Sequence, residues 1–521
     1  VTNAYLSKIP YRDAIRNRLT KLNDYKKSGM PGKHKDGKYY YYENDGLQNQ
    51  SVLYRMDSIG GAPEVFLDPN KLSDNGTVAL TGVYPSPDGK YTAYTISRNG
   101  SDWTEIYVMD TDTRELLKDH IQWAKFTGAS WHGNGFYYSA YPKPVEGKEF
   151  SNANENHQIY YHELGTPQSQ DKLFYEDAKN PLHFHSAYIP EGEDWIFIST
   201  GGAGIGDGLM CKNLRTNSKW NIIEASQDYL VSPIGINNDK VYILTSKGAP
   251  NNRLVTIDLK NPSAPWCEII PEQKSVLTSA QFADDKLILN YEQDASTHLY
   301  VHNLDGSLVR EIKMPTYGTA SVSSDKNEKD VFYTFTSFVY PSAVYKYDLG
   351  SGESKLIKQA DVSGTDFDQY TTEQVFYTSK DGTKVPMFIT YKKGLDKNGK
   401  NPVYLYGYGG FNVSLTPGFS AHRLLWLENG GIYAQASLRG GSEYGESWHM
   451  AGTKLNKLNV FNDFISAAEY MINEGWTSPE YMAIEGGSNG GLLVGATVNM
   501  RPDLFKVAIP RVGVMDMMRY H

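Results

Sequence analysis

Three features that would each point to a particular class of protein are scarce in this sequence. Only two cysteines occur in 521 residues, Cys211 and Cys267. Their wide separation gives no metal-binding spacing, and the sequence does not decide whether they form a disulfide. No apolar run approaches the roughly 20 residues that a membrane-spanning helix needs. No stretch is rich in lysine and arginine, and the net charge is a mild −9. We therefore expect a soluble chain that binds neither nucleic acid nor an anionic membrane.

The length and composition instead favour a β-rich protein of more than one domain. A chain of 521 residues is too long for one ordinary hydrophobic core. Its 40% hydrophobic and 21% charged residues are typical of a globular protein. The 39 tyrosines and 48 glycines favour strands and turns. Before this β-rich part, residues 5–22 read as one helix.

From about residue 36 to 350, short aromatic and β-branched runs alternate with Asp-Gly and Asn-Gly turns. One strand pattern, ending in an acidic or amide residue, recurs seven times at intervals of about 45 to 53 residues. This interval is the size of one four-stranded blade, so the pattern favours a seven-bladed β-propeller. The alternative is an irregular all-β domain with an accidental period, and a sandwich is disfavoured. The seven strands are expected at residues 53–57, 106–110, 159–163, 209–213, 254–258, 299–303 and 344–348.

After residue 361, strands alternate with helices. This alternation, with a serine at the end of one strand, favours an α/β-hydrolase sheet. The predicted fold class is therefore multidomain, with a β-propeller and an α/β-hydrolase domain. The expected elements are a hairpin at 374–378 and 385–390, strands at 403–406, 432–436, 482–485 and 507–509, and an amphipathic helix at 461–474.

The strand at 482–485 leads into Gly486-Gly487-Ser488-Asn489-Gly490, and a helix of small residues follows. This is the pattern of a nucleophile elbow, a sharp strand-to-helix turn that exposes a serine hydroxyl above the sheet edge. Glycines on both sides leave room for so tight a turn. The alternative is a glycine-rich connection whose serine only hydrogen-bonds its own backbone. The flanking strand and helix favour Ser488 as a nucleophile.

A serine hydroxyl is a weak nucleophile until a base takes its proton, so Ser488 needs a histidine that a carboxylate orients. In α/β-hydrolases these partners follow the serine and come from later strands and loops. Asp503, Asp516 and His521 follow Ser488 too closely for these roles, and we interpret all three as structural.

The segment His183-x-His185 could suggest a pair of metal ligands. It lies in a strand-rich region with no third partner, so we interpret both histidines as surface residues. No metal and no cofactor are expected.

Hydrolysis also needs donors directed at the oxyanion of the tetrahedral intermediate. The backbone N–H of Asn489, directly after the nucleophile, is one candidate. The loop Tyr406-Gly407-Tyr408-Gly409-Gly410-Phe411 follows a buried strand, where a second donor is expected. A tyrosine hydroxyl or a glycine N–H could serve. The alternative is an aromatic and glycine-rich loop that packs for structure alone.

Taken together, several stretches resemble the prolyl oligopeptidase family of serine peptidases, in which a seven-bladed propeller caps an α/β-hydrolase domain. The resemblance runs through essentially the whole chain. Asn489 after the serine separates this sequence from related families, which usually carry alanine, histidine or tyrosine there. The stretches that carry the resemblance are 46–54, 66–70, 100–103, 379–387, 406–412, 439–445 and 486–492.

The resemblance implies roles for individual residues. Ser488 would be the nucleophile, and the Tyr408 hydroxyl and the Asn489 N–H would form the oxyanion hole. Phe411 and Val514, together with Asn489, match wall positions of the pocket that holds the proline ring. A rigid apolar slot suits a proline ring, which has no N–H to satisfy.

The resemblance also implies domain boundaries. The propeller, residues 28–363, would be inserted between an N-terminal segment, residues 1–27, and the peptidase domain, residues 364–521. The catalytic aspartate and histidine belong to a last part of the family that this sequence does not contain, and the family's first helical segment precedes Val1. We therefore expect this chain by itself to be inactive.

The expected activity is that of a serine endopeptidase that cleaves short peptides on the carboxyl side of proline through an acyl-enzyme. The expected partners are short proline-containing peptides, and the propeller would exclude folded proteins. We expect a monomer in the cytoplasm or periplasm. Two alternatives stay open: an esterase or acylaminoacyl peptidase of the same fold, and a non-catalytic propeller module that binds proteins.

Overall fold

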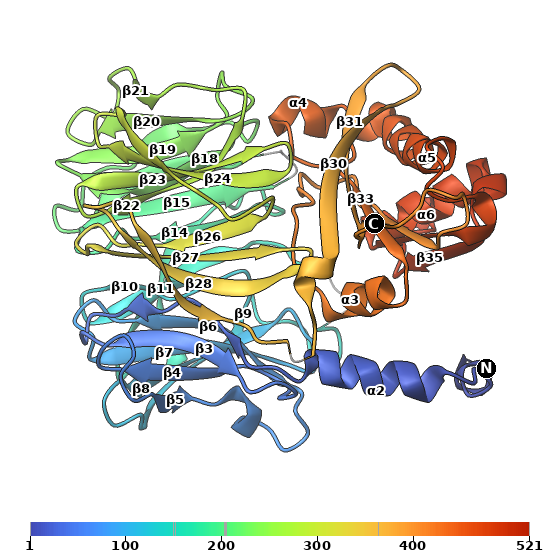
Figure 1. The fold of residues 1–521 in the computed structure, drawn as a ribbon. Coiled ribbons are helices and arrows are strands. Elements are labelled where there is room, and N and C mark those ends of the chain that lie inside the picture. The colour runs from blue at the N-terminus through green and yellow to red at the C-terminus, as the bar shows by residue number, and fades with distance from the viewer. Residues whose placement is uncertain (1, 150, 152, 203–205, 363, 520–521) are drawn as a thin grey trace.

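The computed structural model describes residues 2–149, 151, 153–202, 206–362 and 364–519. A stack of β-sheets and a mixed α/β part lie side by side, and the N-terminal helix α2 projects beneath the α/β part (Figure 1). Within these ranges no helix is long and apolar enough to cross a membrane. Cys211 is a buried free thiol and Cys267 an exposed one.

The β-sheet part is a seven-bladed propeller, as predicted. Ala124 at the end of blade 2 pairs with Ala140 of blade 3, which joins these two blades in one eight-stranded sheet. The blades are, in order, β1 (Lys27–Ser28), β2 (Gly32–Lys33), β3 (Tyr39–Asn44), β4 (Val52–Met56) and β5 (Glu64–Leu67); β6 (Val78–Pro85), β7 (Tyr91–Arg98), β8 (Thr104–Asp110) and β9 (Leu116–Ala124); β10 (Ser130–His132), β11 (Gly135–Ala140), β12 (Gln158–Glu163) and β13 (Lys172–Glu176); β14 (Phe184–Tyr188), β15 (Trp195–Gly201), β16 (Gly208–Asn213) and β17 (Asn221–Glu224); β18 (Val231–Asn237), β19 (Lys240–Thr245), β20 (Arg253–Asp258) and β21 (Cys267–Ile270); β22 (Val276–Ala283), β23 (Lys286–Gln293), β24 (Ser296–Asn303) and β25 (Leu308–Ile312); β26 (Thr319–Ser323), β27 (Asp330–Ser337), β28 (Tyr340–Asp348) and β29 (Ser354–Gln359).

The seven repeats found in the sequence correspond to one position in the blade. They fall on β4, β8, β12, β16, β20, β24 and β28, which pair on both sides within their sheets. Both edges and much of both faces of these strands are covered, an environment that aromatic and β-branched residues fill well. This explains why the third strand of each blade gave the clearest periodic signal.

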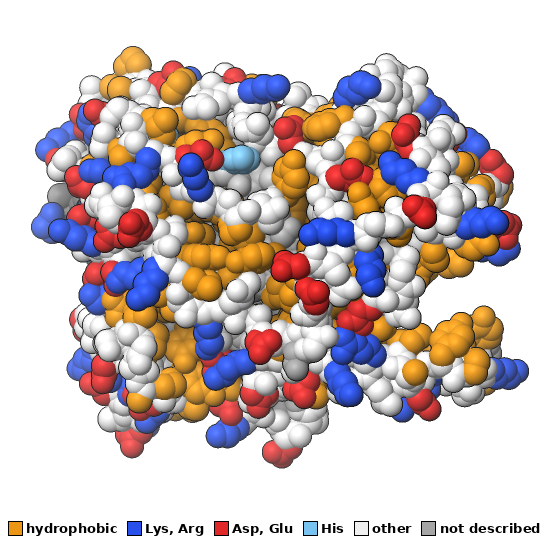
Figure 2. Space-filling view, viewed as in Figure 1, with side chains coloured by type: hydrophobic (Ala, Val, Ile, Leu, Met, Phe, Trp, Pro, Cys, Tyr) orange, Lys and Arg blue, Asp and Glu red, His pale blue; other side chains and the backbone are white. Residues whose placement is uncertain are grey.

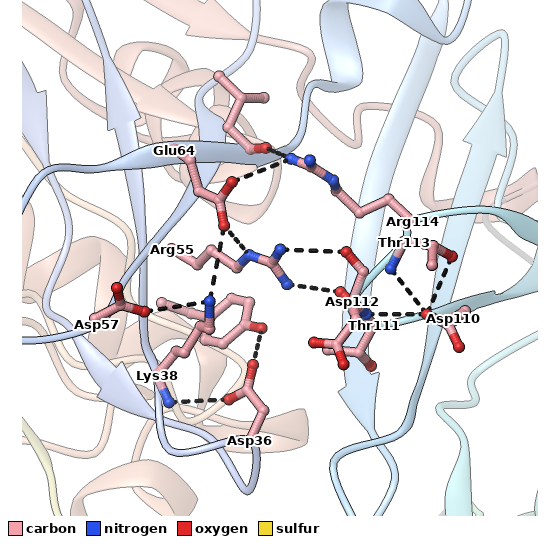
Figure 3. A network of polar contacts seen from close by, with 12 residues as sticks. Asp36, Lys38, Arg55, Asp57, Glu64, Asp110, Thr111, Asp112, Thr113 and Arg114 are labelled. Atoms are coloured by element: carbon pink, nitrogen blue, oxygen red, sulfur yellow. Dashed lines mark hydrogen bonds and ion pairs between the residues drawn. The ribbon is translucent and has the colours of Figure 1, made fainter.

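Buried apolar clusters fill the spaces between consecutive blades. Between blades 4 and 5, for example, Phe197 and Leu209 pack with Val241 and Val255. Polar contacts add to the cluster between blades 1 and 2 (Figure 3). There the buried Arg55 of β4 donates to the Thr111 carbonyl at 2.7 Å and, more weakly, to the Asp112 carbonyl at 3.3 Å.

The α/β part contains one six-stranded sheet in the order β30-β31-β33-β32-β34-β35. Strands β33, β32, β34 and β35 run parallel, whereas β30 and β31 form an antiparallel hairpin at one edge. The elements are β30 (Tyr370–Thr378), β31 (Lys384–Lys392), β32 (Val403–Tyr406), α3 (Ala421–Glu428), β33 (Ile432–Ala436), α4 (Gly445–Met450), α5 (Lys457–Asn473), β34 (Met482–Gly487), α6 (Asn489–Met500) and β35 (Val507–Arg511).

Two helix predictions need correction. The segment 5–22 is not one helix but two, α1 (Thr2–Leu6) and α2 (Arg12–Asn23). The helix is broken at Pro10, because proline lacks an N–H and disfavours helix in the residue before it. The helix expected from Phe461 begins four residues earlier at Lys457. The first residues of α5, Lys457, Leu458 and Asn459, mix polar and apolar side chains, and none of the three is fully buried. The apolar periodicity therefore did not reveal this turn.

The N-terminal helix is fixed to the α/β part rather than to the propeller alone. Leu22 of α2 lies in a buried cluster with Phe388 and Leu424. Arg18 forms an ion pair with Glu428 of α3. The projecting end of this segment carries apolar side chains on the face that Figure 2 shows. Tyr5 and Tyr11 are among the exposed residues of the N-terminal segment.

The loops that follow β32 and β33 contact the propeller. The Thr319 hydroxyl donates to the Pro417 carbonyl at 2.6 Å, and the Glu446 N–H donates to the Pro250 carbonyl at 2.9 Å. The Tyr444 hydroxyl donates to Asp294 at 2.7 Å. These contacts hold the carboxyl-end loops of the sheet against the propeller.

Candidate active site

Ser488 occupies a strained turn between β34 and α6. Its backbone has φ 55° and ψ −114°, a conformation that non-glycine residues adopt rarely and at a cost of about 1–3 kcal/mol. The Ser488 N–H donates to the Arg511 carbonyl at 2.9 Å, and the Leu492 N–H donates to the Ser488 carbonyl at 3.2 Å. These bonds hold the turn from both sides while the Ser488 side chain stays exposed.

The glycines around Ser488 are required by close backbone contacts. A Cβ atom at Gly486 would lie 2.3 Å from the Gly490 carbonyl oxygen. At Gly490 it would lie 2.8 Å from the Gly407 carbonyl oxygen, and at Gly491 it would lie 2.5 Å from the Gly513 Cα. Real Cβ atoms do not approach backbone so closely, so larger residues would displace the neighbouring loops. The tight turn thus depends on the glycines that the sequence pattern singled out.

Two loops flank Ser488 because of the order of strands in the sheet. β32 and β35 lie on either side of β34 and run parallel to it. Their carboxyl ends therefore lie at the same edge as Ser488, where α/β folds bind their ligands. The loop after β32 carries Tyr408 and Phe411, and the segment after β35 carries Val514. The site residues suggested by the sequence are thus gathered at one edge.

Asn489 and the loop of Tyr408 are held together by hydrogen bonds. The Asn489 side-chain Nδ2 donates to the Tyr408 carbonyl at 2.7 Å. A Cβ at Gly410 would lie 2.5 Å from the same nitrogen, so the loop passes directly over the buried Asn489 side chain. As the first residue of α6, Asn489 has a backbone N–H without an intrahelical acceptor. This N–H lies at the positive end of the helix dipole, which favours a developing anion.

Phe411 and Val514 flank the elbow from opposite sides. Phe411 is 66% exposed, has φ 51°, and directly follows the glycines that cover Asn489. Val514 is half-buried and follows Gly513, which touches the start of α6 at Gly491. An apolar surface on each side of a reactive serine can hold an apolar side chain of a substrate.

A buried ion pair that sequence reasoning missed supports this edge of the sheet. Arg439, just after β33, donates through Nε and Nη2 to Asp463 of α5 at 2.9 and 2.6 Å. Ser379 donates to the same carboxylate at 2.6 Å. The Arg439 guanidinium also hydrogen-bonds Asp381 and holds the pKa of that carboxyl at about 2. The next residue, Gly440, touches the Gly409 carbonyl, so the pair fixes the backbone beneath the Tyr408 loop.

Comparison with family models and curated proteins finds relatives along the whole chain. Residues 1–360 match the family model described as prolyl oligopeptidase, N-terminal beta-propeller domain, and residues 417–521 match the prolyl oligopeptidase family model. The chain is 46% identical to the prolyl endopeptidase of Elizabethkingia meningoseptica, over 100% of this chain and 74% of that protein. It is 44% identical to the prolyl endopeptidase of Elizabethkingia miricola over the same shares.

This chain belongs to the prolyl oligopeptidase family. Solved structures agree with that placement. One, from a structural and mechanistic study of two prolyl endopeptidases, has a TM-score of 0.93 and 36% identity, covering 100% of this chain and 77% of that one. Prolyl oligopeptidase B from Galerina marginata, bound to a 35mer hydrolysis and macrocyclization substrate, has a TM-score of 0.95 and 30% identity over the same shares.

Two acidic residues that follow Ser488, Asp503 and Asp516, accept hydrogen bonds from residues close to them in sequence. Asp503 is exposed in η6 (Pro502–Leu504), and both its oxygens accept from Arg501, at 2.8 and 2.7 Å. Asp516 accepts from the Met518 N–H at 3.2 Å. The contacts of Asp503 agree with its interpretation as a turn residue, whereas the interpretation of Asp516 as structural stays a prediction. His521 lies outside the described residues.

One prediction about histidines was wrong. His185 is 1% exposed rather than a surface residue, and its backbone N–H donates to His157 Nδ1 at 2.8 Å. The other nitrogen of His157 donates to the Lys125 carbonyl at 2.9 Å, which fixes this ring as a neutral tautomer. Burial lowers the pKa of His185 to about 4. The packing of blades 3 and 4 covers this pair, and the local sequence gave no sign of it.

Proposed function

We infer that this protein is a serine endopeptidase that cleaves peptides on the carboxyl side of proline. Family membership and the relatives named prolyl endopeptidases support this activity. The observation that carries it is the geometry of Ser488, which lies in a strained elbow at the start of α6, with a loop tied to the following residue. Such a constellation suits acyl transfer.

In the proposed mechanism, Ser488 Oγ attacks the carbonyl carbon of the prolyl residue, and its proton passes to a base. The Asn489 N–H and the Tyr408 hydroxyl donate to the oxyanion that forms. Collapse of this intermediate breaks the C–N bond, and the departing amine takes the proton. Water then hydrolyses the ester on Ser488. The family pattern assigns the base to no residue of this sequence.

We propose that Phe411, Val514 and Asn489 form part of the wall around the proline ring. The exposed ring of Phe411 and the half-buried Val514, on opposite sides of the elbow, support this assignment. Short proline-containing peptides are the proposed substrates. The domain boundaries at 27/28 and 363/364, the monomeric state and the compartment stay predictions.

Fluorophosphonate labelling of the complete gene product tests the nucleophile. We expect labelling of the wild type and none of Ser488→Ala, because the reagent requires an activated serine. A chromogenic Gly-Pro amide tests specificity, and we expect cleavage after proline. Labelling that persists in Ser488→Ala would refute the mechanism. Labelling without cleavage after proline would favour an acylaminoacyl peptidase or an esterase.

Tyr408→Phe tests the second oxyanion donor. Removal of one such donor costs about 10²–10³ in kcat, so we expect a loss of that size with little change in KM. The ring of Tyr408 stays in place in this variant, which separates the hydroxyl from the packing. An unchanged kcat would exclude the hydroxyl from the oxyanion hole.

A further inference from the structure

Lys457, the first residue of α5, contacts the two segments that supply the donors of the proposed oxyanion hole. Its Nζ donates to the Gly409 carbonyl at 2.8 Å and to the Asn489 side-chain Oδ1 at 3.0 Å. Gly409 follows Tyr408, and Asn489 carries the other proposed donor. One ammonium group therefore joins the two segments that supply the donors.

The hydrogen bonds around Lys457 form a connected chain. Lys457 donates to Asn489 Oδ1, and Asn489 Nδ2 donates in turn to the Tyr408 carbonyl at 2.7 Å. The ammonium has only donors, so it fixes the amide of Asn489 with its oxygen toward Lys457 and its nitrogen toward the loop. The consecutive carbonyls of Tyr408 and Gly409 are thus both bound, the first by Asn489 and the second by Lys457.

Packing by the first turn of α5 supplements these bonds. A Cβ at Gly409, which has φ 61°, would lie 2.3 Å from Val460 Cγ1. Lys457 and Val460 are three residues apart on one helix and therefore lie on the same face. The helix holds the loop with an apolar contact and a polar contact one turn apart.

The Lys457 side chain is half-buried, and burial lowers its pKa to about 8. A lysine is usually placed in water, because removing an ammonium from water costs free energy. Both of its acceptors here are amide-type oxygens. These contacts make Lys457 a hydrogen-bond donor to the loop and to Asn489.

We propose that Lys457 is a positioning residue, which holds the Tyr408 hydroxyl and the Asn489 N–H at the separation that the tetrahedral oxyanion requires. This inference rests on the proposed serine peptidase activity. Donors of an oxyanion hole act strongly only when they are fixed before the reaction. Displacements near 1 Å at such a site cost about 10²-fold in rate. Lys457 acts through its neighbours and contacts no reacting atom.

The test compares Lys457→Met with Lys454→Met in the complete gene product. Lys454 is exposed and three residues earlier, so its replacement removes the same charge without touching the loop. For Lys457→Met we expect a fall in kcat of about 10- to 100-fold, with KM changed less than about twofold. The Lys454 variant should keep wild-type kinetics.

Two inhibitors separate positioning from general stability. A peptidyl-prolinal forms a tetrahedral adduct with the nucleophile, whereas the matched peptidyl-pyrrolidide binds without one. Lys457→Met should weaken the aldehyde in parallel with kcat/KM and leave the pyrrolidide within about twofold, because only the adduct uses the oxyanion donors. The proposal would be overturned if the variant weakened both inhibitors equally, or if it weakened neither.

A double-mutant cycle with Tyr408→Phe adds an independent measurement. If Lys457 positions the Tyr408 hydroxyl, the combined loss in kcat must be smaller than the product of the single losses. Independent losses that multiply would overturn the proposal.

A conservative variant keeps the test usable if Lys457→Met fails to fold. Lys457→Gln keeps a donor and should retain more activity than Met, with the same difference between the two inhibitors. If Gln weakens both inhibitors equally, the proposal fails. Absence of Ser488-dependent labelling in the wild type would instead refute the peptidase itself.

Discussion

The two faces of strand β27 make two very different junctions. Val331, Tyr333 and Phe335 face blade 6 and lie in a buried cluster with Ile288 and Val301. The alternate residues face blade 1. There Asp330 accepts from the Tyr39 hydroxyl at 2.6 Å, and the Phe332 ring meets the Tyr39 ring edge-on at 6.2 Å. Successive side chains of a strand point to opposite faces, so one strand serves both junctions.

The junction of blades 7 and 1 continues with ion pairs. Lys33 lies 3.0 Å from Glu328, and Lys358 pairs with Glu43. Among the described residues, none of the buried apolar clusters spans this junction, whereas one lies at each junction between consecutive blades. Polar contacts are weak and directional, while burial of apolar surface is strong and non-directional. We therefore expect the ring to open first where its two ends meet.

The largest effect is expected from Phe335→Ala. This side chain is fully buried between blades 6 and 7, so its truncation should destabilise the propeller by about 3–5 kcal/mol. Hydrogen exchange of β23 and β27 amides measures the local opening free energy. A loss below about 1 kcal/mol would contradict an apolar cluster as the main support of this junction.

The interface between the propeller and the hydrolase domain should lose stability in alkali. Burial raises the pKa of Glu443 to about 8, and the neighbouring charge of Glu292 contributes. Burial also raises the pKa of Glu292 to about 7. Glu292 Oε1 and Glu443 Oε2 are buried without a hydrogen-bond partner in the described part of the chain.

The direction of this pH dependence follows from the number of protons that the folded and unfolded states bind. Between the ordinary carboxyl pKa of 4.5 and these raised values, the folded state binds more protons than the unfolded state. The stabilisation is complete below pH 4.5 and is lost as the pH rises through about 7 and 8. Amide hydrogen exchange in the loop that contains Tyr444 should therefore accelerate with pH by more than the intrinsic exchange rate does. Glu443→Gln should flatten this dependence, and Glu474→Gln, at an exposed position, should not. An unchanged profile in Glu443→Gln would contradict the assignment.

The junction of blades 7 and 1 should behave oppositely and lose stability in acid. Burial alone would raise the pKa of Glu43, but hydrogen bonds from Lys26, Lys358 and Ser28 outweigh it and lower the pKa below its ordinary 4.5. A lowered pKa stabilises the fold above pH 4.5, and this stabilisation is lost as the pH falls through the folded value.

Limited proteolysis between pH 6 and pH 3 measures this opening. Cleavage in β3 or β28 should begin at higher pH than cleavage in β22–β25. Glu43→Gln should open the junction already at pH 6, at a cost of about 1 kcal/mol, since its lysine partners are partly exposed. Simultaneous cleavage of all blades would show that this junction is no weaker than the others.

The smallest effect is expected from Lys33→Met. The pair with Glu328 is about one-third exposed on both sides. Such pairs contribute about 0.2–1 kcal/mol, and salt screens them. We expect a change within about 0.5 kcal/mol in the exchange of β2 and β3 amides, absent at 1 M salt. A salt-independent loss above about 1 kcal/mol would show that Lys33 acts through packing.

The sequence allowed good predictions wherever the cause of the structure is local. The third strand of each blade followed from its aromatic pattern, and strands β32 and β33 were predicted at their observed residues. Gly486, Gly490 and Ser488 could be identified because the elbow is made by five consecutive residues. The features that the sequence did not reveal, or that were predicted wrongly, depend instead on contacts between distant segments. The pairing of Arg439 with Asp463, the burial of His185 and the contacts of Lys457 all join segments that are separate in sequence.

The sequence by itself thus determined the blade repeat, the alternating α/β order and the elbow with its serine, because each depends on neighbours along the chain. Only the tertiary structure decided which groups face one another. It brought Lys457 to the carbonyl of Gly409, and it set Glu292 of the propeller beside Glu443 of the hydrolase domain. It also gave β27 an apolar face toward blade 6 and a polar one toward blade 1. The strand sequence determines the alternation of the two faces, but the residues that each face contacts are fixed only when the ring of blades closes.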